Sequence, residues 1–198
     1  SARSGDYRIE TNVDDLVRFT EAVVANAEAK APPLHVAFSM GVTVVLELYR
    51  RRPDLIGGLV LVAGGADHPY ASNPLFRVPG VGAALLKSMD LAARAVPKSR
   101  RLIAPFMKSD ALVRLTKTVG AIGSEAPHDD IRHFFGSVAD MDLVAYSETI
   151  RSLLRAKASD VLAKVAVPTL VVAPERDVMA LQGDLHALRE GIPNAEWL

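Results

Sequence analysis

One serine between two small residues has the clearest chemistry in the chain. Residues 35–41 read His-Val-Ala-Phe-Ser-Met-Gly, so Ala37 stands two positions before Ser39 and Gly41 two positions after it. A serine hydroxyl is a weak nucleophile that needs exposure, a base and donors for the developing oxyanion. A tight turn from a strand into a helix supplies exposure, and small flanking residues permit it. We therefore predict that Ser39 is a nucleophile, with the Met40 N–H at the helix start as one oxyanion donor.

The elements that position this serine follow from the hydrophobic pattern. Residues 34–38 are a short apolar run typical of a strand, and residues 40–52 form an apolar helix that ends before Pro53. An amphipathic helix is expected over residues 11–29. Further elements are expected as strands at 59–63 and 169–173, a helix over 182–191 and the start of a strand at 195–198. Because the strand segments are continuously apolar, they indicate an α/β fold with a mostly parallel sheet covered on both faces.

The middle of the chain has a different pattern. Between about residues 67 and 157 the strand signal disappears, and helical segments alternate with prolines. We predict a core formed by residues 1–66 and 158–198, with residues 67–157 as a helical insertion over the carboxyl edge of the sheet. The apolar side chains of this insertion either face a cleft or pack against the core.

The order of strand, serine turn, buried helix and strand resembles the nucleophile elbow of the α/β-hydrolase superfamily. The motif is G-x-S-x-G, here with Ala37 in the first small position, and the pair Pro53-Asp54 and the strand after it also match. The resemblance implies an α/β-hydrolase fold with a helical lid. It also implies the activity of a serine esterase or lipase, with a triad of serine, aspartate and histidine and no metal or organic cofactor.

The acid of the triad is assigned by a second part of the resemblance. Residues 168–177 resemble the late strand and acid-bearing loop of the superfamily, which implies that Asp177 orients the histidine. Pro174 stands where a glycine is usual. Glu175 is the nearest rival, and Asp67, after the strand at 59–63, is another that we rank below Asp177.

The catalytic histidine has no clear candidate. The resemblance places it after the strand in which the chain ends, and His186, the one histidine beyond Asp177, falls inside a predicted helix. His35, His128 and His133 are assigned to a strand and to helical positions. We therefore expect a fragment that lacks the first strands, with the second oxyanion donor, and the last strand and helix. Such a fragment is expected to be inactive and prone to aggregate through exposed sheet edges.

The composition of the chain limits the classes of partner that it could bind. Lys+Arg and Asp+Glu are 23 each, which gives no electrostatic case for nucleic acid. There is no cysteine, which excludes thiolate catalysis and fits a cytoplasmic protein, and no apolar stretch reaches the length of a membrane span. The first residue is not Met, so an N-terminal leader could have been lost.

The expected function is hydrolysis of a small, apolar ester or related acyl compound. Phe38, beside the nucleophile, and His68, after the second strand, are expected to contact this substrate. Serine rather than aspartate at the turn argues against a haloalkane dehalogenase, while acyl transfer, haloperoxidase-like chemistry and C–C bond hydrolysis remain open. The alternative is a non-catalytic α/β-hydrolase-like protein that binds a small ligand.

Overall fold

The computed structural model describes residues 6–26, 31–67, 104–118, 122–173 and 182–198, together with Gly80, Ala84, Lys87 and Leu91. The chain divides into two compact units. The first consists of Ser1–Gly82 and Glu148–Leu198, and the second of Ala83–Ser147. These divisions differ from the boundaries expected at 66/67 and 157/158. The role of the second unit as a lid stays a prediction.

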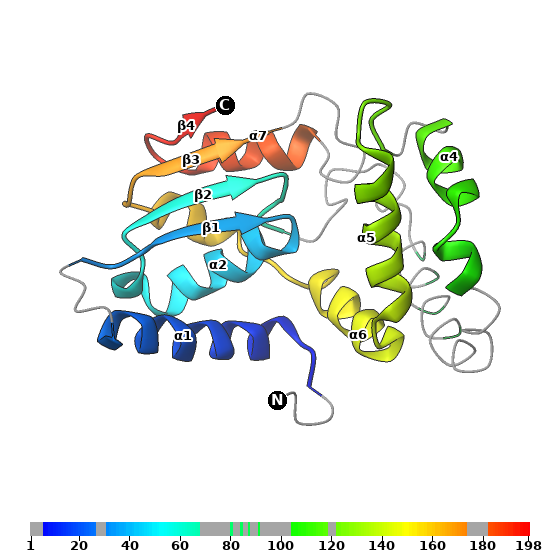
Figure 1. The fold of residues 1–198 in the computed structure, drawn as a ribbon. Helices are drawn as coiled ribbons and strands as arrows, with labels where there is room; N and C mark the ends of the chain where they lie inside the picture. Colours follow the sequence, from blue (N-terminus) through cyan, green and yellow to red (C-terminus); the bar gives the residue numbers. More distant parts are fainter. Residues whose placement is uncertain are drawn as a thin grey trace. The chain divides into compact units, whose positions relative to one another are not determined.

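The first unit contains a four-stranded parallel sheet in the order β1-β2-β3-β4 (Figure 1). The strands are β1 (Leu34–Phe38), β2 (Gly58–Val62), β3 (Thr169–Val172) and β4 (Glu196–Trp197). Val36 pairs with Val60, and Val60 pairs in turn with Leu170. The prediction of a parallel sheet is confirmed, and β1 has the predicted bounds. Because all strands run the same way, their carboxyl ends share one edge, where ligands bind in open α/β sheets.

The helices of this unit connect the strands and pack on the sheet. They are α1 (Ile9–Asn26), α2 (Met40–Arg51), the 3₁₀ helices η1 (Pro53–Leu55) and η3 (Ser159–Lys164), and α7 (Gln182–Gly191). Pro53 ends α2, as predicted, because it lacks the N–H that a further helical turn requires. The helix predicted over 11–29 begins two residues earlier, at Ile9, and its described part ends at Asn26.

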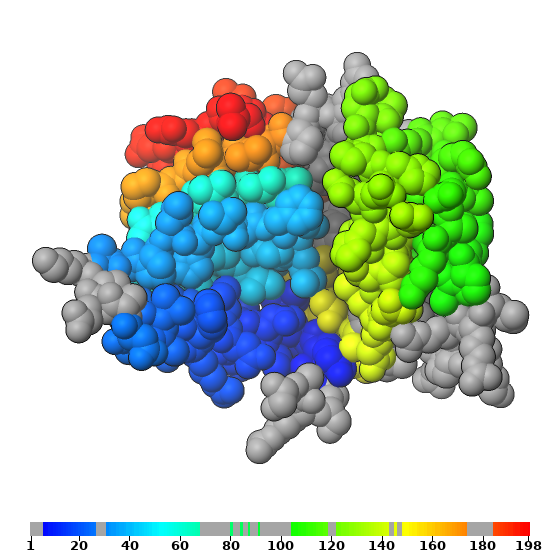
Figure 2. All heavy atoms as spheres, viewed as in Figure 1, coloured from blue at the N-terminus to red at the C-terminus, as the bar shows by residue number. Residues whose placement is uncertain are grey.

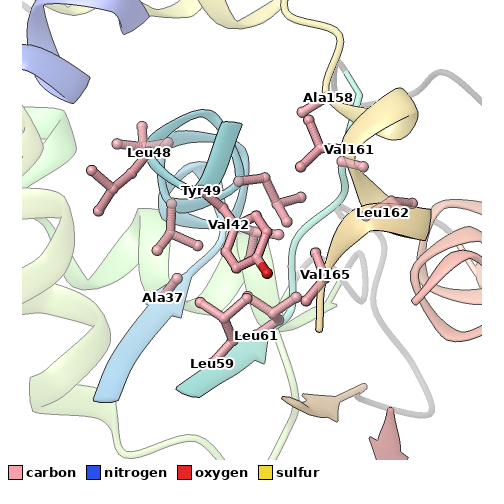
Figure 3. Close-up of a cluster of buried hydrophobic side chains, with 14 of the residues drawn as sticks. Ala37, Val42, Leu48, Tyr49, Leu59, Leu61, Ala158, Val161, Leu162 and Val165 are labelled. Atoms are coloured by element: carbon pink, nitrogen blue, oxygen red, sulfur yellow. The ribbon is translucent and has the colours of Figure 1, made fainter. Parts of the chain in front are cut away.

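One hydrophobic core joins α2, η3 and one face of the sheet. Figure 3 shows Ala37, Leu59 and Leu61 of the sheet directed toward side chains of α2 and of the η3 region. The helix α2 is apolar on most of its surface, and Leu46 and Leu48 are fully buried. Burying a leucine side chain contributes about 1.5–3 kcal/mol, so these leucines stabilise the packing of α2 against the sheet.

The opposite face of β1 is exposed. Leu34, Val36 and Phe38 are 62%, 70% and 70% exposed, and Figure 2 shows β1 and β2 at the surface in this view. The expectation that both faces are covered is therefore wrong for β1. Alternate residues of a strand face opposite sides of the sheet. Ala37 faces the side that packs on the helices, so Leu34, Val36 and Phe38 face the other side, which is exposed.

The described part of the second unit is helical, as expected. It contains α4 (Asp110–Thr118) and α5 (His128–Asp140), while α6 (Leu143–Leu153) spans the division between the units. His128 Nε2 lies 2.9 Å from an Asp110 carboxylate oxygen, and the Lys108 ammonium donates to Asp140 at 2.8 Å. No helix in the described ranges is both long and apolar enough to cross a membrane.

Candidate active site

Ser39 occupies the turn between β1 and α2 in an unusual backbone conformation. Its φ is 51° and its ψ is −119°, and the residue is exposed. A positive φ is uncommon for a residue with a Cβ atom and costs of order 1–3 kcal/mol. Such strain persists only where the surrounding structure imposes it. The conformation therefore places an exposed hydroxyl-bearing residue at the tip of a strained turn.

Two backbone hydrogen bonds hold this turn. The Ser39 N–H donates to the carbonyl oxygen of Val62 at 2.9 Å, which ties the turn to the end of β2. The Val42 N–H donates to the carbonyl oxygen of Ser39 at 3.0 Å, which ties it to the first turn of α2. Both backbone groups of Ser39 are thus engaged within the protein.

The small residues on either side of Ser39 are in ordinary contact. A Cβ atom at Gly41 would lie 3.8 Å from the Cβ of Ala37, a normal van der Waals separation. Ala37 is buried in the core beneath the turn. Ala37 and Gly41 are therefore in ordinary van der Waals contact, and position 41 has room for a methyl group.

The tight position is Gly64, which the sequence analysis missed. A Cβ atom there would lie 2.3 Å from the carbonyl oxygen of Ser39 and 2.7 Å from Cγ2 of Val42. The signal was present in the sequence as the pair Gly64-Gly65 directly after an apolar strand. Glycine at the end of a strand often marks a close approach of two backbones.

Met40 is the first residue of α2. The amides of a first helical turn lack intrahelical acceptors, and the helix dipole makes this end favourable for negative charge. The position is compatible with the predicted oxyanion donor, whose role stays a prediction. Phe38 ends β1 on the exposed face, and its contact with substrate is likewise a prediction.

Two predicted site residues, Asp177 and His68, lie outside the described residues, as does the rival acid Glu175. Their roles remain predictions. The other rival acid, Asp67, has a structural partner. One of its carboxylate oxygens accepts the N–H groups of Ala158 at 3.1 Å and Ser159 at 2.9 Å, at the start of η3. This carboxylate therefore satisfies backbone donors at the start of η3, and the choice between Asp67 and Asp177 as the acid stays a prediction.

The four described histidines each have a local explanation. His186 is exposed on α7, with its ring stacked on Trp197 at a centroid distance of 6.1 Å. His35 lies on β1, with its ring nitrogens 3.4 Å from the Thr20 hydroxyl and 3.3 Å from the Pro33 carbonyl oxygen. Burial lowers the pKa of His35. His128 pairs with an aspartate of the second unit, and His133 is exposed there.

No hydrogen bond joins Ser39 to a histidine among the residues that the structure describes, and the base of the triad stays a prediction. The described residues also contain no group of three or more histidine, aspartate and glutamate side chains arranged to hold a metal ion.

Comparison with known proteins identifies the fold. Models of protein families find no match to the sequence, and neither do curated protein sequences. Solved structures match over the whole chain. They include MGS-M2, an α/β hydrolase from a Medee basin deep-sea metagenome library (18% identity, TM-score 0.64), and a hydrolase from Pseudomonas aeruginosa (17%, 0.66). A thermophilic esterase from Thermogutta terrifontis is similar to a comparable degree (17%, 0.63).

Each of these comparisons covers 100% of this chain and 65% of the solved chain. The chain therefore has the α/β-hydrolase fold, over a length that is about two thirds of these structures. The prediction of fold class from the serine motif and its flanking elements is confirmed.

Proposed function

We propose that the protein is a serine hydrolase that cleaves a small ester or related acyl compound, with Ser39 as its nucleophile. The observation that carries the proposal is the exposed, strained turn of Ser39, φ 51°, between the end of a parallel strand and the start of a helix. Strained residues cluster at functional sites because the strain pre-organises a reactive group. The likeness of the fold to proteins described as hydrolases and an esterase supports the same class of reaction.

The reaction follows from the chemistry of an acyl group. The Ser39 Oγ forms a bond to the carbonyl carbon while its proton passes to a histidine, and the carbonyl electron pair becomes an oxyanion. The Met40 N–H is the proposed donor to that oxyanion. When the oxyanion collapses, the bond to the leaving group breaks and the histidine protonates that group. Water then releases the acid by the same steps.

The base and acid of this proposal come from outside the described residues. Asp177 is the proposed acid, and a histidine that the described residues do not supply is the proposed base. Removing one triad member leaves only about 10³–10⁴-fold rate enhancement over the reaction in water. The activity is therefore assigned to the full-length protein.

A fluorophosphonate probe tests the proposal, because it phosphonylates only an activated serine. We expect the full-length protein to gain one phosphonyl adduct, mapped to Ser39 by peptide mass spectrometry, and Ser39→Ala to gain none. Ser137→Ala, which alters an exposed serine of α5, serves as the matched control and should label like the wild type. Equal labelling of Ser39→Ala would disprove the assignment. Absence of labelling in the folded wild type would favour the non-catalytic, ligand-binding alternative.

A further inference from the structure

We infer that Gly64 and Thr43 are positioning residues that hold Ser39 in its strained turn. Gly64 belongs to residues 62–65, which form the end of β2 and the chain directly after it, and Thr43 binds this segment. This inference rests on the proposed function, since it concerns the same nucleophile. Residues 62–65 are called the buttress segment below. Three independent contacts place this segment against the turn.

The first contact is the approach of two main chains at Gly64. The Ser39 carbonyl oxygen would lie 2.3 Å from a Cβ atom at position 64, and the Val42 Cγ2 atom 2.7 Å from it. Such separations are far below van der Waals contact, and the nearest atom belongs to the backbone, which cannot swing aside as a flexible side chain does. Any residue other than glycine must therefore displace Ser39 or the first turn of α2.

The second contact is the hydrogen bond from the Ser39 N–H to Val62, the first residue of the buttress segment. The next residue, Ala63, has a φ of 48°, so a second residue with a Cβ atom adopts the left-handed region. Its N–H donates to the carbonyl oxygen of Val172 at 3.0 Å, which anchors the segment to β3. Two strained residues thus lie on the joined ends of neighbouring strands.

The third contact comes from Thr43, one turn into α2. The Thr43 side chain is buried, and its hydroxyl donates to the carbonyl oxygen of Gly65 at 3.0 Å. This bond fixes the far end of the buttress segment to the helix that begins at Met40. The turn of Ser39 is therefore enclosed between a bond at Val62, a main-chain contact at Gly64 and a side-chain bond at Gly65.

This enclosure has a catalytic consequence. The carbonyl group that faces Gly64 also accepts the Val42 N–H, so a displacement there moves the Ser39 hydroxyl and the Met40 amide together. A shift of about 1 Å in a reacting group lowers the rate by about 100-fold. Substrate binding by groups elsewhere in the site is not altered by this shift. We therefore expect the loss to appear in kcat and not in KM.

The test uses the full-length protein with p-nitrophenyl butyrate as substrate and the fluorophosphonate probe. We expect Gly64→Ala to lower kcat by about 100-fold, with KM changed by less than about threefold and with a matching fall in the rate of phosphonylation. Thr43→Val removes one hydrogen bond of a buried hydroxyl and should lower kcat by about five- to tenfold. Thr43→Ser keeps the hydroxyl and should restore most of the wild-type kcat.

Two matched controls separate positioning from loss of stability. Gly191→Ala also introduces a clash, 2.7 Å from a Leu162 side-chain atom, but at the end of α7 that precedes the start of β4. Thr169→Val removes a buried hydroxyl that donates to a carbonyl oxygen at 2.9 Å at the start of β3. Both controls lie toward the amino ends of the strands and should lower Tm without lowering kcat at a temperature where they are folded.

The outcomes are distinct. Wild-type kcat in both Gly64→Ala and Thr43→Val would overturn the inference while leaving Ser39 as the nucleophile. The same kcat loss in Gly191→Ala at an equal loss of Tm would also overturn it. If Gly64→Ala does not fold, the comparison of Thr43→Val with Thr43→Ser decides, since equal kcat in the two would contradict the inference. A wild-type protein whose Ser39 does not react would overturn both the proposed function and this inference.

Discussion

The hydroxyl of Tyr49, on α2, accepts the backbone N–H of Ala166 at 3.0 Å, just before β3. The same hydroxyl donates to the carbonyl oxygen of Lys164 at 3.3 Å, so one phenol satisfies a donor and an acceptor of the chain that leads into the strand. The Tyr49 ring is buried in the core between these elements (Figure 3). The helix that follows the Ser39 turn is thus joined directly to the chain segment that leads into β3, the strand before the proposed acid loop.

Removal of this hydroxyl should destabilise the protein. Tyr49→Phe preserves the ring but leaves the Ala166 N–H and the Lys164 carbonyl without their partner, and an unsatisfied buried polar group costs about 1–3 kcal/mol. The free energy of unfolding, measured by urea denaturation of the full-length protein, should fall by that amount. An unchanged midpoint and slope of the urea unfolding curve would contradict this prediction and indicate that water takes the place of the hydroxyl.

Replacing Ala63 by glycine should stabilise the protein. Its φ of 48° is unfavourable for alanine, and Ala63→Gly should raise the free energy of unfolding by roughly 0.5–1 kcal/mol. The matched control is Ala22→Gly at an exposed position of α1, where glycine should lower stability by roughly 1 kcal/mol. The same change should therefore have opposite signs at the two sites, and a loss at both would contradict the strain at Ala63.

Substitution of Asp67 and of Asp177 should show which of these two carboxylates is the acid of the proposed triad. Asp67→Ala removes the acceptor for two N–H groups at the start of η3 and should lower stability by about 1 kcal/mol, yet leave the phosphonylation rate of Ser39 near that of the wild type. Asp177→Asn should lower kcat by about 10⁴-fold, as loss of the orienting carboxylate does in serine hydrolases. The reverse pattern would transfer the role of the acid to Asp67.

His35 should make stability depend on pH. Burial lowers its pKa in the folded protein below the unfolded value of 6.5, so the unfolded chain binds the proton more tightly. The stability that this histidine contributes is present above pH 6.5 and is lost as the pH falls below it. Urea unfolding between pH 7.5 and 5.5 should show this loss. His35→Asn should reduce the dependence, and an unchanged dependence in this variant would contradict its assignment to His35.

The exposed face of β1 should promote self-association of the 198-residue chain. Leu34, Val36 and Phe38 form an apolar row without a charge, and uncovered apolar strands are templates for aggregation. Val36→Lys should lower the apparent mass measured by static light scattering. Leu115→Lys, at a similarly exposed apolar position of α4, should have a smaller effect. A monomeric wild-type chain would contradict this expectation.

The sequence predicted the bounds of helices and strands better than it predicted the contacts and the exposure of their residues. The strand at 34–38 and the helix at 182–191 have the predicted bounds, because apolar runs and flanking prolines and glycines mark them locally. The exposure of Val36 was not predicted, since an apolar run does not reveal which of its faces has a neighbour. Gly64 was missed for a related reason. Its contact with Ser39 is between residues 25 positions apart, and it appears only when β1 and β2 are placed side by side.

The contact between Gly64 and the Ser39 carbonyl joins two main chains, and this has a consequence for engineering. A library that randomises the neighbourhood of Ser39 can vary Phe38, whose side chain is exposed. It gains nothing from randomising position 64, because no choice of rotamer or compensating side chain creates room between two peptide groups. Mutational tolerance around this serine should therefore be uneven, with the strictest position 25 residues away from it in the chain.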